Sequence, residues 1–187
     1  MTDSSAVGAV TYLYEVGVLK RSKRTGWWFA DIASPESVAD HSHRTAVIGA
    51  MLAVEEGADP ARVALLCTFH DTQETRTGDI PHIGKRYVGR KVDNQGVTAD
   101  QLAVTSPAVR DYFGAAVDEF ERQETVEAVV ARDADKLECL LQAVEYRSHG
   151  YQTDRWIKSS LGSLKTETAR LWAETALEID PQRWLVA

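Results

Sequence analysis

Apolar residues recur at three- and four-residue intervals along most of this chain, which is the period of one face of an α-helix. No stretch keeps the strict alternation of apolar and polar residues that a half-buried strand requires. The pattern therefore predicts an all-α protein that folds as a single-domain helical bundle. The expected helices cover about residues 6–19, 35–56, 60–77, 98–104, 106–119, 124–150, 153–160 and 165–179.

Both ends of the chain carry amphipathic helices around a core that is expected to span about residues 10–150. The apolar stripe of the first helix consists of Val7, Val10, Leu13, Tyr14 and Val18. The last two helices are expected to pack back onto the core. Their apolar residues are Trp156, Leu164, Leu171, Trp172 and Leu177.

The helix that begins near Pro35 presents a histidine on its apolar face. Ser34 is suited to cap this helix, and Gly57 is suited to end it in the left-handed conformation. His41 shares a face with the apolar positions, whereas His43 lies about 160° away and is expected to be exposed. Spacing alone leaves two interpretations of His41, a hydrogen-bonded core histidine or a ligand.

The next helix ends in a group of polar side chains on its apolar face. His70 and Glu74 are one turn apart, and Asp71 is three residues from Glu74, so all three can point to one place. Burying His70 and Asp71 there is costly unless a charge compensates them, and a divalent metal is the usual compensation. The turn that follows adds Asp79.

The longest expected helix, 124–150, carries acidic residues in the middle of a wide apolar stripe. Asp133 and Asp135 both need a partner, either a surface cation or a metal in the interior. Helical spacing leaves open which of the two faces inward. The stretch 82–97 is the least regular part of the chain, and it either closes over a site or forms a solvated connection.

Composition restricts the class of ligand. A length of 187 residues suits one domain, and a net charge of −7 argues against binding a nucleic-acid polymer, although a small phosphorylated molecule remains possible. No apolar run is long enough to cross a membrane, and the N-terminus lacks a secretion signal, so a cytoplasmic protein is expected. Cys67 and Cys139 are then expected to be free thiols.

Two histidines and two aspartates on three separate helices form a mixed nitrogen and oxygen donor set. Such a set suits Mn²⁺, Co²⁺, Fe²⁺ or Zn²⁺, whereas the absence of paired cysteines argues against a closed structural zinc site. One divalent metal ion is therefore the expected cofactor, with Mg²⁺ as a further possible identity.

The order and spacing of these residues resemble the H…HD…D signature of the HD-domain metal-dependent phosphohydrolases. The resemblance is closest to the subgroup that contains the 5′-deoxynucleotidases and human HD domain-containing relatives, and it covers about residues 10–150. Four blocks carry it, namely residues 19–27, residues 35–41, residues 70–80 and residues 133–138.

The resemblance implies roles for individual residues. It implies an HD-type helical fold, frequent homodimers and one divalent cation whose ligands are His41, His70, Asp71 and Asp135. It thereby favours Asp135 over Asp133. It also implies that Glu74 and Asp79 are catalytic carboxylates and that Arg24 and Trp27 contact the substrate, although Thr25 and Gly26 separate this Arg and Trp.

By this resemblance the expected activity is release of phosphate from (deoxy)nucleoside 5′-monophosphates. Glu74 is placed to orient or deprotonate a water, or to protonate the leaving oxygen through Asp79, and Arg24 to hold phosphate oxygens. One alternative is a phosphohydrolase acting on another small phosphate ester or on a nucleoside triphosphate. Another is a metal-binding regulatory module without turnover.

Overall fold

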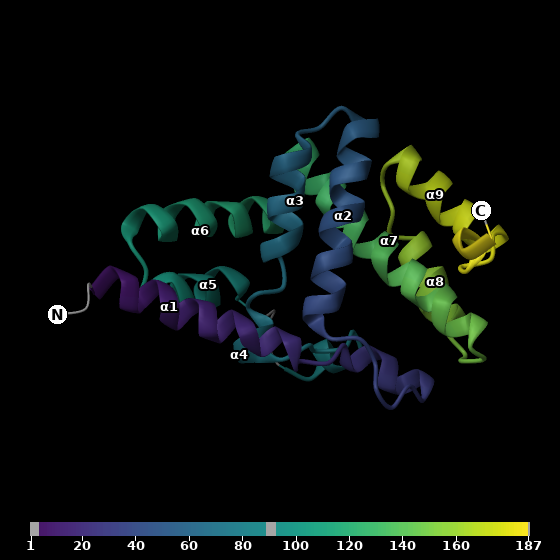
Figure 1. Ribbon diagram of the computed structural model, residues 1–187, viewed down its shortest axis with the longest axis horizontal. Coiled ribbons are helices and arrows are strands. Elements are labelled where there is room, and N and C mark those ends of the chain that lie inside the picture. Colours follow the sequence, from purple (N-terminus) through teal and green to yellow (C-terminus); the bar gives the residue numbers. More distant parts are fainter. Residues whose placement is uncertain (1–3, 89–92, 187) are drawn as a thin grey trace.

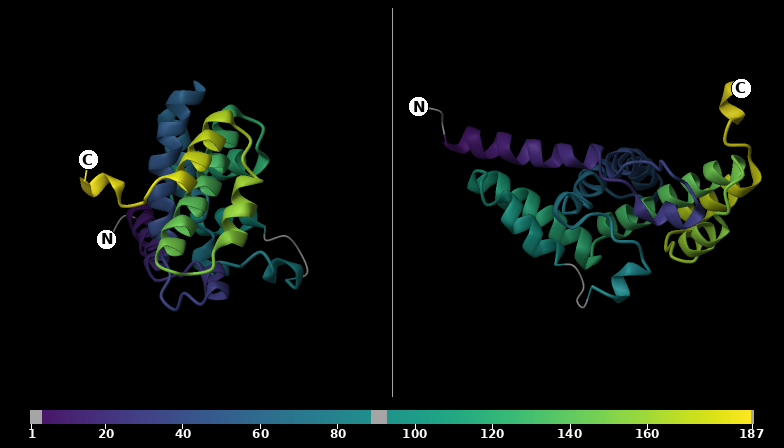
Figure 2. Two further views of the ribbon diagram at one scale, coloured as in Figure 1. Left: turned by 90° about the vertical axis from the view of Figure 1, so that its right-hand side faces the viewer. Right: turned by 90° about the horizontal axis from the view of Figure 1, so that it is seen from below.

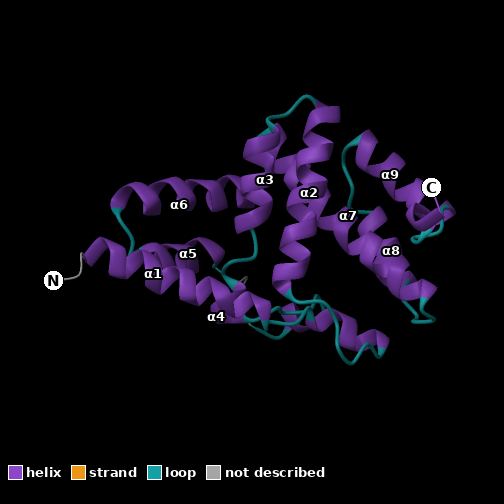
Figure 3. Ribbon diagram, viewed as in Figure 1, coloured by secondary structure: helices purple, strands orange, loops and turns teal. Residues whose placement is uncertain are grey.

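The computed structural model describes residues 4–88 and 93–186, and within these ranges the chain is helical without any strand (Figure 1, Figure 3). The α-helices are α1 Ser4–Val16, α2 Val38–Glu56, α3 Pro60–Phe69, α4 Glu74–Thr77, α5 Asn94–Leu102, α6 Pro107–Arg122, α7 Val126–Ser148, α8 Asp154–Leu161 and α9 Glu167–Glu178. Short 3₁₀ helices are η1 Gly17–Lys20, η2 Thr25–Ala30, η3 Gly84–Arg86 and η4 Arg183–Val186. The all-α prediction is confirmed.

Helices α2, α3 and α7 form the centre of the molecule (Figure 1). They bury leucine and valine side chains almost completely, including Leu52, Val63, Leu66, Leu137 and Leu140. Small residues let these helices approach closely: a Cβ at Gly49 would lie only 2.7 Å from the Cys67 sulfur. His41 is on α2, Asp135 is on α7, and His70 directly follows the last residue of α3. The packing of these three helices therefore decides where the three side chains meet.

The remaining helices lie at two ends of this centre. Helices α1, α5 and α6 lie together at the end that holds the N-terminus, and α8 and α9 lie at the end that holds the C-terminus (Figure 2). As predicted, the C-terminal helices pack back onto the core through buried residues such as Ile157, Leu164 and Ala173. Leu171 is an exception because it is 61% exposed.

Helix α2 begins three residues later than predicted. Ser37, not Ser34, is its cap: its hydroxyl accepts a hydrogen bond from the Asp40 amide, and the Asp40 carboxylate accepts one from the Ser37 amide. This reciprocal capping box satisfies two amides that would otherwise lack a partner. Gly57 ends the helix in the left-handed region, with φ of 70°, as predicted.

The helix that carries His70 is also shorter than predicted. Helix α3 ends at Phe69, His70 to Gln73 form a turn, and the separate four-residue helix α4 begins at Glu74. The backbone at His70 keeps helical angles, with φ of −60° and ψ of −31°. Therefore Glu74 belongs to a different element from the one that buries Val63 and Leu66.

The apolar stripe of the first helix faces outward. Val7, Val10, Leu13 and Tyr14 are 47–80% exposed, while Gly8 and Tyr12 are buried. Gly8 lies against the backbone of Val104 so closely that a Cβ there would overlap the carbonyl oxygen. Small and aromatic residues of α1 thus provide its packing, and its aliphatic residues form a surface.

Within the described part of the chain, no helix combines the length and apolar character that crossing a bilayer demands.

Helix η3 and the start of α5 lie in the stretch 82–97, which was expected to be irregular. Residues 89–92 of that stretch are outside the described residues.

Candidate metal centre and active site

Two buried imidazoles face one another between α2 and the end of α3. The Nε2 atoms of His41 and His70 are 3.3 Å apart, and the two side chains are at most 2% exposed. His70 donates its Nδ1–H to the carbonyl of Cys67 at 2.6 Å, because a carbonyl oxygen can only accept. The Nδ1 atom of His41 bonds to the Glu138 carboxylate in the same way. Both Nε2 atoms are therefore directed at the same space.

Two aspartates complete this group, which we call the donor cluster (His41, His70, Asp71 and Asp135). Asp71 Oδ2 lies 3.1 Å from His70 Nε2 and 3.7 Å from His41 Nε2, and these three donor atoms lie within 4.8 Å of one another. Asp135 reaches the cluster from α7, with its Oδ1 3.4 Å from His41 Nε2.

The structure gives Asp133 and Asp135 different surroundings. Asp133 is fully buried and points to the other side of α7, where it accepts hydrogen bonds from the Lys165 amide at 3.0 Å and from the Thr166 amide at 2.7 Å. It thus anchors the start of α9. Asp135 instead contacts His41 and, through its other oxygen, Lys136 Nζ at 3.0 Å.

The donor cluster fits a divalent cation. Burial and the neighbouring Arg24 lower the pKa of His41, but the Glu138 and Asp135 carboxylates outweigh them and raise it to about 10. Burial raises the pKa of Asp71, and His70 and Arg24 bring it well below its usual range. A site that holds two carboxylates ionised and draws positive charge onto His41 can exchange that proton for a metal ion. The cluster could hold a divalent metal in this way.

Glu74 lies next to the donor cluster in a different protonation state. Burial and the charge of Asp71 raise its pKa to about 9, so the carboxyl carries a proton near neutral pH. Its Oε2 atom is buried, and no hydrogen-bond partner for it exists in the described part of the chain. A buried carboxyl oxygen of this kind is available to a water or a substrate oxygen.

Arg24 and Asp79 come together beside Asp71. Arg24 Nη1 lies 3.4 Å from Asp71 Oδ2 and 3.7 Å from Asp79 Oδ1. Asp79 also accepts hydrogen bonds from the Thr25 amide and hydroxyl, and the Thr25 hydroxyl donates to the Asp79 carbonyl at 2.7 Å. Thr25, one of the residues that separate Arg24 from Trp27, therefore joins η2 to the turn after α4.

Trp27 lies beside the site but is almost completely buried. Its ring is 2% exposed, stacks on Trp156 at 5.4 Å between centroids, and donates its indole N–H to Glu36 Oε1 at 3.0 Å. Trp27 also borders a cavity that contains Arg24 and Asp79. Its role as a substrate contact stays a prediction.

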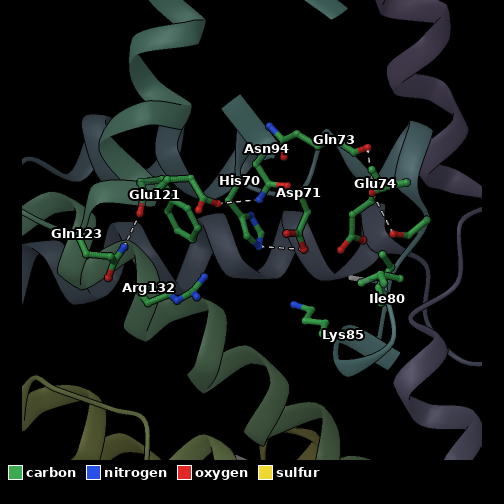
Figure 4. Close-up of a pocket in the computed structure, with 14 residues that line it drawn as sticks. His70, Asp71, Gln73, Glu74, Ile80, Lys85, Asn94, Glu121, Gln123 and Arg132 are labelled. Carbon is green, nitrogen blue, oxygen red and sulfur yellow. Dashed lines mark hydrogen bonds and ion pairs between the residues drawn. The ribbon is translucent and has the colours of Figure 1, made fainter. Parts of the chain in front are cut away.

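Two cavities of about 470 and 460 Å³ meet at this site. Both are bordered by Asp71, Glu74, Ile80, Lys85 and Arg132. In the first cavity, His70 and Asp71 lie at the centre, and Lys85 and Arg132 lie on the side opposite Gln73 and Asn94 (Figure 4).

Sequence analysis missed several of these residues. Lys85 and Arg132 line the cavities, but a cation in a loop or at a helix surface has no periodic signal. Glu138 could have been found, because it lies three residues after Asp135 in the apolar helix and faces the same side.

The fold and the donor cluster together describe a helical protein in which two histidines and two aspartates could hold a metal ion. The HD domain family model matches residues 16–176. The chain is 33% identical to the 5′-deoxynucleotidase HDDC2 of Mus musculus, over 78% of this chain and 73% of that protein. It is 34% identical to the 5′-deoxynucleotidase HDDC2 of Xenopus laevis, over 76% of this chain and 71% of that protein.

Solved structures share the fold. A conserved hypothetical protein from Pyrococcus furiosus superposes with a TM-score of 0.72 at 28% identity, over 90% of this chain and 97% of that chain. The chain therefore belongs to the HD domain family.

Proposed function

We propose that this protein hydrolyses (deoxy)nucleoside 5′-monophosphates to nucleoside and phosphate. It is a metal-dependent phosphohydrolase of the HD domain family. The observation that carries the proposal is the donor cluster with the buried Glu74 carboxyl on one side and Arg24 on the other. The names of the HDDC2 relatives supply the substrate class.

The donor cluster and Glu74 have different roles in the proposed reaction. His41, His70, Asp71 and Asp135 would hold the cation, which supplies a reactive water at neutral pH and offsets charge on the phosphoryl group. Glu74, whose pKa is raised by burial and by the charge of Asp71, is suited to donate a proton to the leaving 5′-oxygen.

Two more residues serve the substrate. Arg24 is suited to hold the non-bridging phosphate oxygens by its guanidinium fork. Asp79 keeps Arg24 in place by an ion pair at 3.7 Å and by its hydrogen bonds to Thr25. The nucleoside would occupy one of the two cavities that meet at Asp71, with Trp27 at the border of one of them.

The test is phosphate release from a panel of deoxy- and ribonucleoside 5′-monophosphates and triphosphates. The protein is stripped with a chelator and then assayed after addition of Mn²⁺, Co²⁺, Fe²⁺, Zn²⁺ or Mg²⁺, the cations that suit this donor set. The expected result is metal-dependent release from deoxynucleoside monophosphates. No release with any of the metals would reject the proposal in favour of a regulatory module that binds metal without turnover.

A second candidate is hydrolysis of a nucleoside triphosphate or another small phosphate ester. The cations Lys85, Arg132 and Lys136 line the cavity that contains Arg24, and they are candidates to contact the additional phosphates of a triphosphate. In the same panel, this candidate predicts release of pyrophosphate or tripolyphosphate. Faster turnover of triphosphates than of monophosphates would favour it.

We further propose that the protein is a homodimer in solution. Helices α1 and α2 both carry apolar side chains that are exposed on the surface. They include Leu13, Tyr14, Met51 and Val54, each more than half exposed, and apolar surfaces of this kind mark interfaces.

Sedimentation equilibrium tests the dimer. The double variant Leu13→Glu with Met51→Glu is expected to be monomeric, whereas Leu171→Glu, an exposed leucine on α9, leaves a dimer. A monomeric wild-type protein would reject the proposal.

We also place the reaction in the cytoplasm. Cys67 and Cys139 are free thiols in this structure. A reducing compartment keeps thiols in that state. Fractionation of cells that express the protein is expected to recover it with cytoplasmic markers, and recovery in an oxidising compartment would reject this location.

A further inference from the structure

A buried chain of polar contacts leads from the donor cluster to the surface between α2 and α7. His41 and Glu138 are fully buried, and His41 Nδ1 bonds to Glu138 Oε2. The other oxygen of Glu138 accepts two hydrogen bonds from Arg44, from Nε at 2.9 Å and from Nη2 at 2.8 Å. Arg44, which is partly exposed, also binds Glu145 Oε1 at 2.7 Å.

We propose that Glu138 is a positioning residue that orients His41 toward the metal, and that Arg44 holds Glu138 in place. The proposal rests on the metal site of the proposed function. It assigns no contact with the substrate to either residue.

The two oxygens of Glu138 have separate partners, which is what this role requires. A carboxylate accepts but does not donate, so His41 must present a proton on Nδ1 to Oε2. The lone pair of Nε2 is then left for a metal. Because the ring torsion of histidine is only weakly restrained by its own rotamer preference, this bond fixes the plane of the ring.

The two imidazoles of the donor cluster are fixed by different groups. His70 is held by the backbone carbonyl of Cys67, which no substitution removes. His41 is held by a side chain that reaches across from α7. Glu138 lies one turn after Asp135, so the same helix supplies a ligand and the support of a second ligand. Metal affinity is therefore sensitive to Glu138.

Glu36 is a competing candidate for this support, since it lies close to both His41 and Glu138. However, its Oε1 accepts the indole N–H of Trp27 at 3.0 Å, and within the described part of the chain no hydrogen bond joins Glu36 to His41. Glu138, in contrast, bonds to His41 through Oε2 and to Arg44 through Oε1.

The charge of Glu138 strengthens metal binding even though the metal must displace a proton from His41. The metal ion and the proton bind the same nitrogen of His41. A dication gains more electrostatic free energy from a nearby carboxylate than a single proton does. Removing the charge while keeping the shape of the side chain therefore weakens metal binding.

The experiment titrates Mn²⁺ or Co²⁺ into the full, metal-stripped protein by calorimetry, without substrate. Glu138→Gln is expected to lower affinity by roughly 10- to 100-fold, the effect of losing a residue that supports a metal ligand. The matched control is Asp133→Asn, a second fully buried acid on α7. It is expected to unfold at a lower temperature and to bind metal with wild-type affinity.

A milder variant covers the case in which Glu138→Gln does not fold. Arg44→Gln alters a partly exposed side chain and is expected to lower metal affinity by about 3- to 10-fold, since Glu138 loses part of its support. Wild-type affinity in a folded Glu138→Gln protein would overturn the proposal. If that protein does not fold, wild-type affinity in Arg44→Gln would overturn it.

The result of the metal titration can be interpreted independently of the phosphate-release assay. A wild-type protein that binds metal but releases no phosphate would reject the nucleotidase activity, and the ratio of affinities would still decide the role of Glu138. A wild-type protein that binds neither metal ion would overturn the positioning role directly.

Discussion

The donor cluster and the segment that carries the acid-base groups are held by different means. His41, His70 and Asp135 are buried where α2, the end of α3 and α7 pack through their apolar faces. Glu74 and Asp79 instead lie on a four-residue helix and the turn after it, which we call the acid-base segment (residues 74–79). A helix of this length is not stable alone, so other elements must hold it.

Polar contacts from α1 supply much of that support. The Glu15 carboxylate accepts hydrogen bonds from Arg76 at 2.7 and 2.9 Å, from the Thr75 hydroxyl at 3.0 Å and from the Gln101 amide at 2.9 Å. Apolar packing thus fixes the donor cluster, and a network of charged and polar groups fixes the Glu74 carboxyl that we propose to be catalytic. Metal binding and turnover should therefore be separable by substitution.

The largest effect is expected from the donor cluster itself. His70→Ala removes one of two facing imidazoles and is expected to lose metal and turnover together. The loss of affinity should exceed the roughly 10- to 100-fold typical of a supporting residue. Metal content by mass spectrometry and phosphate release measure both.

The control for this variant is His43→Ala, which changes an exposed histidine on α2. It is expected to keep metal and activity. If His70→Ala bound metal as tightly as the wild type, the assignment of this ligand would be wrong.

The next effect should fall on turnover alone. Glu74→Gln keeps the shape of the protonated carboxyl but cannot release a proton, so turnover is expected to drop by roughly 10²- to 10⁴-fold. Metal content should stay at the wild-type level, because Glu74 is outside the donor cluster. Loss of metal in this variant would contradict the division between the two regions, and normal turnover would remove Glu74 from the mechanism.

Sequence analysis predicted the two regions unequally, for a physical reason. The position of His41 on the buried face of α2 and the exposure of His43 follow from helical periodicity, and both are confirmed. Periodicity also predicted the long helix α7. It could not separate Asp133 from Asp135, because both face inward, one toward the start of α9 and the other toward His41.

Other features of the structure are not contained in periodicity. An apolar stripe does not say whether it faces the core or a surface, and on α1 it faces outward. The break between α3 and α4 depends on a turn at His70 inside a pattern that continues as a helix. The pairing of Glu138 with Arg44, and that of Glu15 with Arg76, depends on how distant helices align, which no local pattern records.

A smaller effect is expected when the support of the acid-base segment is weakened. Glu15→Gln removes the charge that holds Arg76 while leaving the donor cluster untouched, so turnover is expected to fall by about 3- to 30-fold because Glu74 is less well positioned. Metal affinity should not change. Asp111→Asn, which removes the partner of Arg110 on the surface of α6, is the control and is expected to have wild-type turnover.

The smallest effect concerns stability in acid. Hydrogen bonds from Arg76 lower the pKa of Glu15 from 4.5 to about 2, and the opposing effect of burial is smaller. A carboxyl whose pKa is lower in the folded than in the unfolded protein stabilises the fold above the unfolded pKa, and this contribution is lost as pH falls toward 2. Wild type should exceed Glu15→Gln in stability at pH 6 by about 1 kcal/mol.

That difference should shrink as the pH falls from 4.5 toward 2, since the wild-type carboxylate then takes up a proton. Urea unfolding of both proteins at pH 6 and near pH 2.5 measures it, provided that both remain folded at the lower pH. Equal stability of the two proteins at pH 6 would mean that Glu15 holds α4 by its shape and not by its charge. The acid-base segment would then resemble the donor cluster in relying on packing, and the contrast between the two regions would be lost.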